Sequence, residues 1–205
     1  MPKSRRNKRS KAAVVDAEPT PLSIFQHPLL HALLLAALYT SIAIAVLGIG
    51  AWSPPMLAIA ATLAGLLIGA SVVDIQQLRL PDWINAAILL LGLATAALGG
   101  LAAVGWSAAA AAAGFALLWL VGEAYHRVRG IRGIGLGDAK LLGAGLAHVG
   151  IGALPSVVLI AAAAALVAVA VVRLAGTRVA WHDRVAFGPF LALAIWIVWI
   201  SGPLV

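Results

Sequence analysis

The sequence predicts an all-α polytopic membrane protein with about seven transmembrane helices, within a range of six to eight. Of its 205 residues, 63% are hydrophobic and only 10% are charged. Apolar runs of up to about 20 residues, the length that spans a bilayer as a helix, recur along the chain. The basic residues lie in alternate connectors between these runs. Together, these three observations favour a helical membrane protein over a soluble domain.

Seven apolar runs define the expected helices, with boundaries good to a few residues. They cover residues 28–50, 55–73, 83–104, 107–125, 139–150, 155–172 and 185–200. A signal peptide is the alternative for the start of the chain. However, residues 12–26 are acidic and contain proline, and the first apolar run is too long for the core of a signal peptide. We therefore expect an uncleaved first helix.

Lysine and arginine residues predict the orientation of the chain. Six of the 14 lie in residues 1–11, and the other eight lie in the connectors 74–82, 126–140 and 173–186. The intervening connectors hold none. With seven spans, all basic residues face one side of the membrane, and the positive-inside rule makes that side cytosolic. We expect residues 1–26 to form a basic cytosolic tail and residues 27–205 to form the transmembrane domain.

Charge and cysteine content limit the partners and cofactors expected for this chain. The net charge of +7 could suggest nucleic acid, but the basic residues are explained by membrane orientation. The chain has no cysteine, which excludes disulfides and thiolate metal sites. We expect the lipid bilayer as a partner, no nucleic acid, and neither a metal nor a cofactor. The spacing of glycines in residues 92–100 fits either dimerisation or internal packing, so the oligomeric state stays open.

Two aspartates, Asp74 and Asp138, are expected at membrane depth. Asp74 ends the second apolar run and Asp138 precedes the fifth, so both lie at the cytosolic end of a helix. An ionisable group there costs a few kcal/mol, which makes it a candidate functional residue. Most other acidic residues are expected to be solvated, and Glu123 is expected to pair with Arg127 four residues later.

The fifth apolar run is unusually short. Its 12 residues would span about 18 Å as a helix, less than a hydrocarbon core of about 30 Å. Either the helix extends into the outer connector, or Asp138 is recessed into the membrane in a water-filled cavity. Gly135 and Gly137 would let a backbone or an extended substrate approach closely.

Two carboxylates at matched depth are typical of an aspartic protease. Neighbouring carboxylates share one proton, so one takes a proton from water while the other donates to the peptide carbonyl. Activity would then depend on pH through two coupled ionisations. The alternative is that Asp74 and Asp138 are interfacial helix-end residues, with Asp138 stabilised by its helix N-terminus. Asp82 follows Leu80-Pro81, is expected to be the N-cap of the third helix, and is the reserve catalytic carboxylate.

Three segments resemble one family of membrane proteases. The segment GIGLGDAKLLGAGLAHVG (133–150) is similar to the GxGD signature of type IV prepilin leader peptidases, including the lysine after the aspartate. The segment DIQQLRLPDWI (74–84) is similar to the first aspartate motif of that family. The segment VAFGPFLALAIW (185–196) resembles its C-terminal Pro-Phe-Gly-Pro motif, with Ala186 where proline is usual. The resemblance covers residues 53–203.

The resemblance implies roles for particular residues. Asp74 and Asp138 would be catalytic, and Gly135, Gly137 and Lys140 would belong to the active-site loop. Gly188 and Pro189 would form a helix-start segment near the site. The implied activity is removal of a basic leader from prepilins or pseudopilins at the cytosolic side of the bacterial cytoplasmic (inner) membrane.

Many members of that family also carry a cytosolic domain with paired CxxC motifs, linked to methylation of the new N-terminus. This chain has no cysteine, so the resemblance implies a short form with peptidase activity rather than N-methyltransferase activity. Two alternatives stay open. One is a signal-peptide-peptidase-like enzyme that cuts within transmembrane helices and also uses GxGD. The other is a non-enzymatic membrane transport or assembly subunit.

Overall fold

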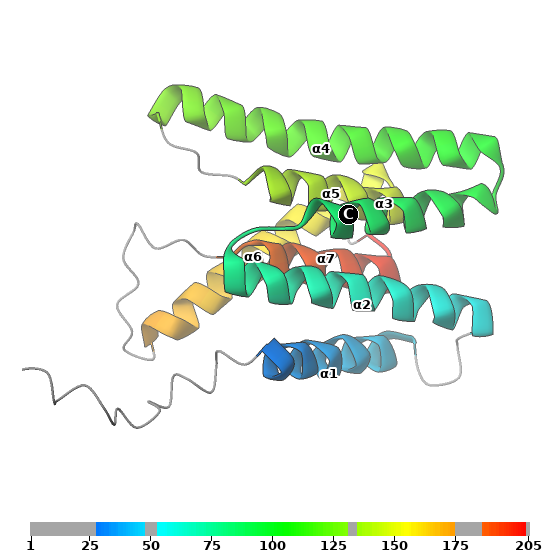
Figure 1. The fold of residues 1–205 in the computed structure, drawn as a ribbon, viewed down its shortest axis with the longest axis horizontal. Helices are drawn as coiled ribbons and strands as arrows, with labels where there is room; N and C mark the ends of the chain where they lie inside the picture. The colour runs from blue at the N-terminus through cyan, green and yellow to red at the C-terminus, as the bar shows by residue number, and fades with distance from the viewer. Residues whose placement is uncertain (1–27, 48–52, 131–134, 175–185, 204–205) are drawn as a thin grey trace, which may run out of the picture.

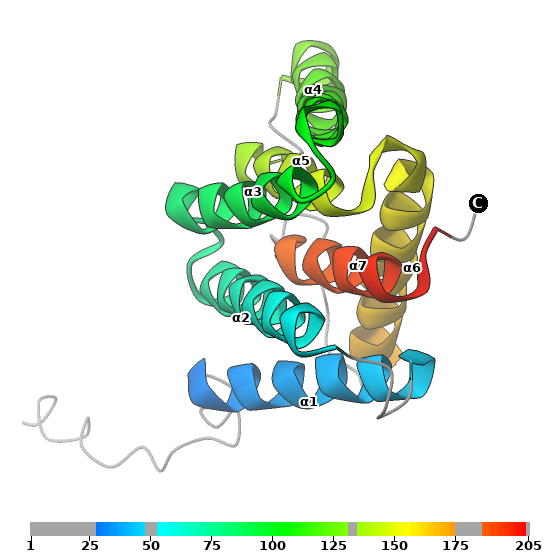
Figure 2. The same cartoon turned by 90° about the vertical axis from the view of Figure 1, so that its right-hand side faces the viewer.

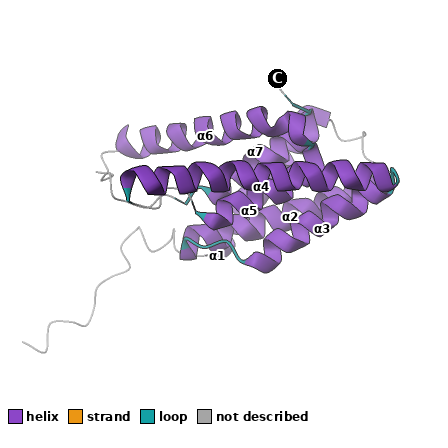
Figure 3. Ribbon diagram, turned by 90° about the horizontal axis from the view of Figure 1, so that it is seen from above, coloured by secondary structure: helices purple, strands orange, loops and turns teal. Residues whose placement is uncertain are grey.

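The computed structural model describes residues 28–47, 53–130, 135–174 and 186–203, and the structural statements below refer to these residues. They form seven α-helices and one short 3₁₀-helix, without a strand (Figure 3). The elements are α1 (Pro28–Leu47), α2 (Pro54–Gln77), α3 (Asp82–Ala97), α4 (Leu101–Arg129), α5 (Leu136–Val149), η2 (Ile151–Ala153), α6 (Leu154–Leu174) and α7 (Gly188–Ser201). The all-α prediction is confirmed for these ranges, whereas the predicted tail, residues 1–26, lies outside them.

Several of the helices suit a bilayer. Three stretches of the described chain are long and apolar enough to cross a membrane, namely Pro54–Gln77, Leu101–Arg129 and Ile151–Leu174. Three shorter apolar helical stretches are Leu30–Ala45, Asp82–Ala97 and Gly188–Ser201. These features support a helical membrane protein. The number of spans and the orientation stay predictions.

The turn between α3 and α4 differs from the prediction. The third helix was expected to run to residue 104 and the fourth to start at residue 107, but α3 ends at Ala97 and α4 begins at Leu101, with Trp106 on its exposed surface. Gly100 adopts a φ of 92°, which glycine adopts easily because it has no Cβ. The break therefore falls at the glycine pair 99–100, and the alanine-rich residues that follow continue as helix.

The short helix α5 lies at the centre of the bundle. It packs against α3, α4 and α7 (Figures 1 and 2), and eight residues between Ala139 and Ala147 are buried. A Cβ at Gly143 would lie 2.7 Å from the backbone oxygen of Ala111 in α4, and one at Gly145 would overlap Ile195 of α7. Glycine at these positions lets neighbouring helices approach closely. The helix, about 21 Å long, is thus surrounded by protein.

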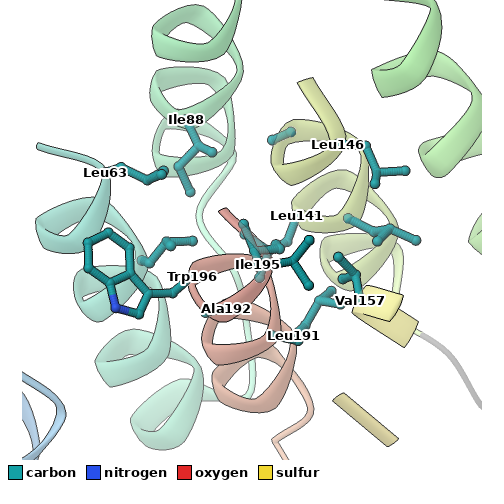
Figure 4. Close-up of a cluster of buried hydrophobic side chains, with 14 of the residues drawn as sticks. Leu63, Ile88, Leu141, Leu146, Val157, Leu191, Ala192, Ile195 and Trp196 are labelled. Carbon is teal, nitrogen blue, oxygen red and sulfur yellow. The ribbon is translucent and has the colours of Figure 1, made fainter. Parts of the chain in front are cut away.

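The hydrophobic core joins α5 and α7 to the helices around them. Figure 4 shows Leu191 and Ile195 of α7 facing Leu141 of α5, with Leu63 of α2 and Ile88 of α3 nearby. All five side chains are at most 2% exposed. Burial of each such side chain contributes roughly 1.5–3 kcal/mol in water, and less where lipid is the alternative surrounding. This cluster fixes the positions of the two short helices relative to α2 and α3.

One end of the bundle collects the basic residues. The ends of α2, α4 and α6 and the starts of α3, α5 and α7 lie toward the left in Figure 1. Every lysine and arginine of the described ranges lies on or beside these helix ends: Arg79, Arg127, Arg129, Lys140 and Arg173. For these five residues, the segregation of charge expected from the sequence is present in three dimensions.

Candidate active site

Asp74 lies in the last turn of α2 and is directed at the start of α7. Asp74 is buried, with only 6% of its surface exposed. The Oδ2 atom accepts a hydrogen bond of 3.0 Å from the backbone N–H of Gly188, the first residue of α7. The first N–H groups of a helix have no partner within the helix and carry partial positive charge. Asp74 therefore caps a helix that lies 114 residues further along the chain.

Gly188 and Pro189 make this contact possible. Pro189 occupies the second position of α7, where a missing N–H costs nothing because that group would have no partner. A Cβ at Gly188 would lie 2.6 Å from Oδ2 of Asp74 and 3.0 Å from its Cγ. Only glycine lets the carboxylate reach the backbone here. The sequence-predicted helix-start segment thus contacts the first aspartate directly.

Asp138 lies in the first turn of α5 and is partly buried. Its carboxylate accepts a hydrogen bond from the backbone N–H of Gly135, the N-cap residue three positions earlier. This is the reciprocal half of a capping box, in which a side chain at the third helical position satisfies the N-cap N–H. Asp138 is also close enough to Asp74 for their charges to interact. The structure therefore brings together two aspartates that are 64 residues apart in the sequence.

The chain between α2 and α3 packs against the start of α5. Leu78 ends α2 in the left-handed conformation, with a φ of 51°, and donates its N–H to the backbone oxygen of Asp74. Leu80 then lies against Gly137, where a Cβ would be 3.0 Å from Cβ of Leu80. Gly137 thus allows the link after Asp74 to approach the helix that carries Asp138.

Asp82 has a different role from the one expected. The N-cap of α3 is Pro81, and Asp82 is the first helical residue, without a side-chain capping bond. Its Oδ1 instead lies 2.6 Å from Nζ of Lys140, and the Asp82 side chain is 75% exposed. The N-cap prediction is wrong because α3 begins at Asp82, one residue earlier than expected, and the carboxylate pairs with Lys140 of α5 instead. Lys140, whose role the sequence did not define, joins α3 to α5.

Other sequence expectations have clear outcomes. Glu123 pairs with Arg127 at 2.9 Å, which confirms the predicted surface ion pair. Gly92, in the segment with dimer-like glycine spacing, is buried against Ala147 and His148 of α5. At that position the spacing serves internal packing.

Sequence reasoning missed Asn85, in the first turn of α3. It is only 5% exposed, and neither its side-chain nitrogen nor its side-chain oxygen has a hydrogen-bond partner. The signal in the sequence was an amide in the apolar stretch after LPDW. Within the described ranges, no three His, Cys, Asp or Glu side chains form a group that could hold a metal ion.

The fold and this site define a helical membrane protein in which two aspartates at helix ends lie close enough for their charges to interact. Its similarity to known proteins identifies its family. The sequence profile described as "Type IV leader peptidase family" matches residues 61–170, more than half of the chain. The chain belongs to the type IV leader peptidase family.

Three curated relatives illustrate the similarity. A "Prepilin leader peptidase/N-methyltransferase" from Burkholderia pseudomallei (strain 1026b) is 40% identical over 130 residues, 63% of this chain and 42% of the relative. Proteins with the same name from Neisseria gonorrhoeae and Pectobacterium carotovorum subsp. carotovorum are 34% and 32% identical, over 68% and 82% of this chain and 47% and 58% of the relatives. The chain thus spans about half the length of these relatives. No solved structure matches it significantly.

Proposed function

We propose that the chain is a membrane-embedded aspartic endopeptidase that removes the basic leader from type IV prepilins or pseudopilins. The observation that carries the proposal is the convergence of Asp74 and Asp138 at the starts of α5 and α7. Family membership supports the substrate class, because the matched relatives are named prepilin leader peptidases. The proposal covers cleavage only and does not include methylation.

In the proposed reaction, the two aspartates together hold one proton before the substrate is attacked. The ionised carboxylate takes a proton from water as the water oxygen attacks the carbonyl carbon of the scissile peptide bond. The protonated carboxyl group donates its proton to the carbonyl oxygen, which gives a neutral tetrahedral diol. The C–N bond then breaks as the carboxyl group that took the water proton donates it to the leaving amine, a diol hydroxyl returns its proton to the other carboxylate, and the leader ends in a new carboxyl group. Two interacting carboxylates titrate as one unit, so the rate should fall at both low and high pH.

The proposed location is the cytosolic side of the bacterial cytoplasmic membrane. All basic residues of the described ranges lie at the same end of the bundle as the two aspartates, and basic segments face the cytosol. Asp74 and Asp138 lie at helix ends, so a leader in the cytosol would reach them without crossing the bilayer. The tail, residues 1–26, would lie on the same side.

A cleavage assay tests this function. Purified chain in detergent is incubated with a type IV prepilin, and mass spectrometry locates the cut. We expect one cut between the basic leader and the hydrophobic segment. A membrane peptide that has a hydrophobic helix but no leader serves as the control and should stay intact. Cleavage inside the hydrophobic helix would indicate an intramembrane protease, and no cleavage of several prepilins would favour the non-enzymatic alternative.

A further inference from the structure

A cavity of about 470 Å³ lies between α3, α4 and α5. Its α5 lining is formed by Lys140, Gly143 and Ala144, which lie on the side of that helix turned away from Asp138, given about 100° of rotation per residue. Small alanines of α4, including Ala111 and Ala112, form one wall. Neither Asp74 nor Asp138 lines the cavity, although the cavity and Asp138 both lie beside the first turns of α5.

The one polar end of this cavity contains an unusual side chain. Asn85 lines the cavity beside Asp82 and Lys140, is 5% exposed, and has no hydrogen-bond partner for its amide nitrogen or oxygen. Burying an unpaired carboxamide costs folding free energy, whereas an apolar residue of the same size would not. A carboxamide offers donors and an acceptor side by side, which match the C=O and N–H of a peptide group.

The position of the cavity fits a substrate chain that continues from the site. Its polar end is formed by Lys140, two residues after Asp138, and by Asp82, which follows the short link after Asp74. From there it runs along α3 as far as Leu93, a length of about 16 Å. The cavity thus extends from the end of the bundle that holds the aspartates toward its middle, and its far part is apolar.

We propose that this cavity binds the apolar segment that follows the scissile bond of the peptide substrate, with Asn85 hydrogen-bonded to one of its peptide groups. The proposal rests on the proposed endopeptidase function and names the groups that hold its substrate. A peptide fits better than a phospholipid. A lipid phosphate at the polar end would meet the Asp82 carboxylate beside Lys140, and an acyl chain offers Asn85 no partner. Asn85 is thus a positioning residue.

The absence of native cysteine allows a direct test. Ala112→Cys places a thiol in the cavity wall, and Ala113→Cys places one next to it on the exposed surface of α4, outside the lining. Both are made in an Asp138→Asn background so that the substrate stays intact. The rate of alkylation by N-ethylmaleimide is measured with and without a type IV prepilin, and separately with added phosphatidylglycerol. We expect prepilin to slow alkylation at position 112 at least fivefold and to leave position 113 unchanged.

Each other outcome of this experiment has a definite meaning. Equal protection of position 112 by phosphatidylglycerol would identify a lipid site and overturn the proposal. If wild type cleaves prepilin but prepilin does not protect position 112, the cavity proposal fails and the endopeptidase function stands. If prepilin protects position 112 but wild type does not cleave it, the cavity proposal holds as peptide binding and the endopeptidase function fails. If neither occurs, both are wrong.

A second variant tests Asn85 itself. Asn85→Leu removes the unpaired buried amide, so we expect the Tm to rise by a few degrees. Loss of the hydrogen bonds to the substrate should raise KM about tenfold and leave kcat within about twofold. If Asn85 had only a structural role, Asn85→Leu would not raise KM while leaving kcat unchanged in a protein that has become more stable. An unchanged KM would show that Asn85 does not contact the substrate.

Discussion

At the scale of single residues, the site depends on atoms that approach each other more closely than side chains usually allow. The Asp74 carboxylate reaches the backbone of Gly188, and Asp138 reaches back to the N–H of Gly135. Each aspartate therefore satisfies a helix N-terminus that would otherwise lack a partner. This also restrains each carboxylate, since a hydrogen bond to the backbone limits the rotation of its side chain.

Gly188→Ala tests the orientation of Asp74. Because the new Cβ would lie 2.6 Å from Oδ2 of Asp74, the carboxylate must move and lose its hydrogen bond. We expect prepilin cleavage to fall about 10- to 100-fold, since such displacements are costly to catalysis. Steady-state kinetics with folded variants measures the loss. Gly69→Ala is the matched control in α2, where a Cβ meets nothing within 4 Å, and it should cleave like wild type. Full activity in Gly188→Ala would contradict this arrangement.

At the scale of elements, the short helices α5 and α7 position the site because other helices surround them. Their apolar character was readable from the sequence, and so was the presence of Asp138 at a helix start. A pairing of Asp74 with Asp138 was expected as well, but the particular hydrogen-bond and ion-pair partners were not. Asp82 and Lys140 are 58 residues apart, and Asp74 and Gly188 are 114 apart. A single sequence does not reveal which atoms of distant residues will contact each other. The N-cap role expected for Asp82 came from its neighbours in the sequence, whereas its observed partner is Lys140 of another helix.

The ion pair between Asp82 and Lys140 is expected to couple α3 to α5. A double-mutant cycle with Asp82→Asn and Lys140→Met should give a coupling free energy of about 0.5–1 kcal/mol, because Asp82 is largely exposed to solvent. Thermal unfolding in detergent provides the measurement. Glu123→Gln and Arg127→Met form the reference cycle within α4, where a pair four residues apart should couple by about 0.3–0.5 kcal/mol. Strictly additive effects at Asp82 and Lys140 would show that the contact contributes no stability.

At the scale of the whole molecule, alternate helix ends separate a basic side from one without lysine or arginine in the described ranges. This pattern was the most predictable property of the chain, since it depends on hydropathy and charge rather than on side-chain packing. The α3–α4–α5 cavity was not predictable, because its walls are ordinary alanines and leucines whose meeting depends on how the helices pack. Asn85 is visible in the sequence, but its burial is not.

Single cysteines can establish the orientation, because the native chain has none. Val128→Cys lies near the basic end of α4, and Leu98→Cys lies at the α3–α4 turn; both positions are more than 80% exposed. In intact cells, a maleimide that cannot cross the cytoplasmic membrane should label position 98 and leave position 128 unlabelled until the cells are permeabilised. The opposite labelling pattern would place the aspartates on the outer side and contradict the proposed location.

The most direct test of the central claim compares the cleavage rates of Asp74→Asn and Asp138→Asn with that of wild type on one prepilin. Each variant keeps the size of the side chain but cannot take or share the proton. If the aspartates work as a pair, each change alone should reduce the rate at least 1,000-fold, and the double variant should be no slower. Glu123→Gln, which alters an exposed carboxylate of α4, should retain the wild-type rate. Cleavage near the wild-type rate by either folded aspartate variant would contradict the account.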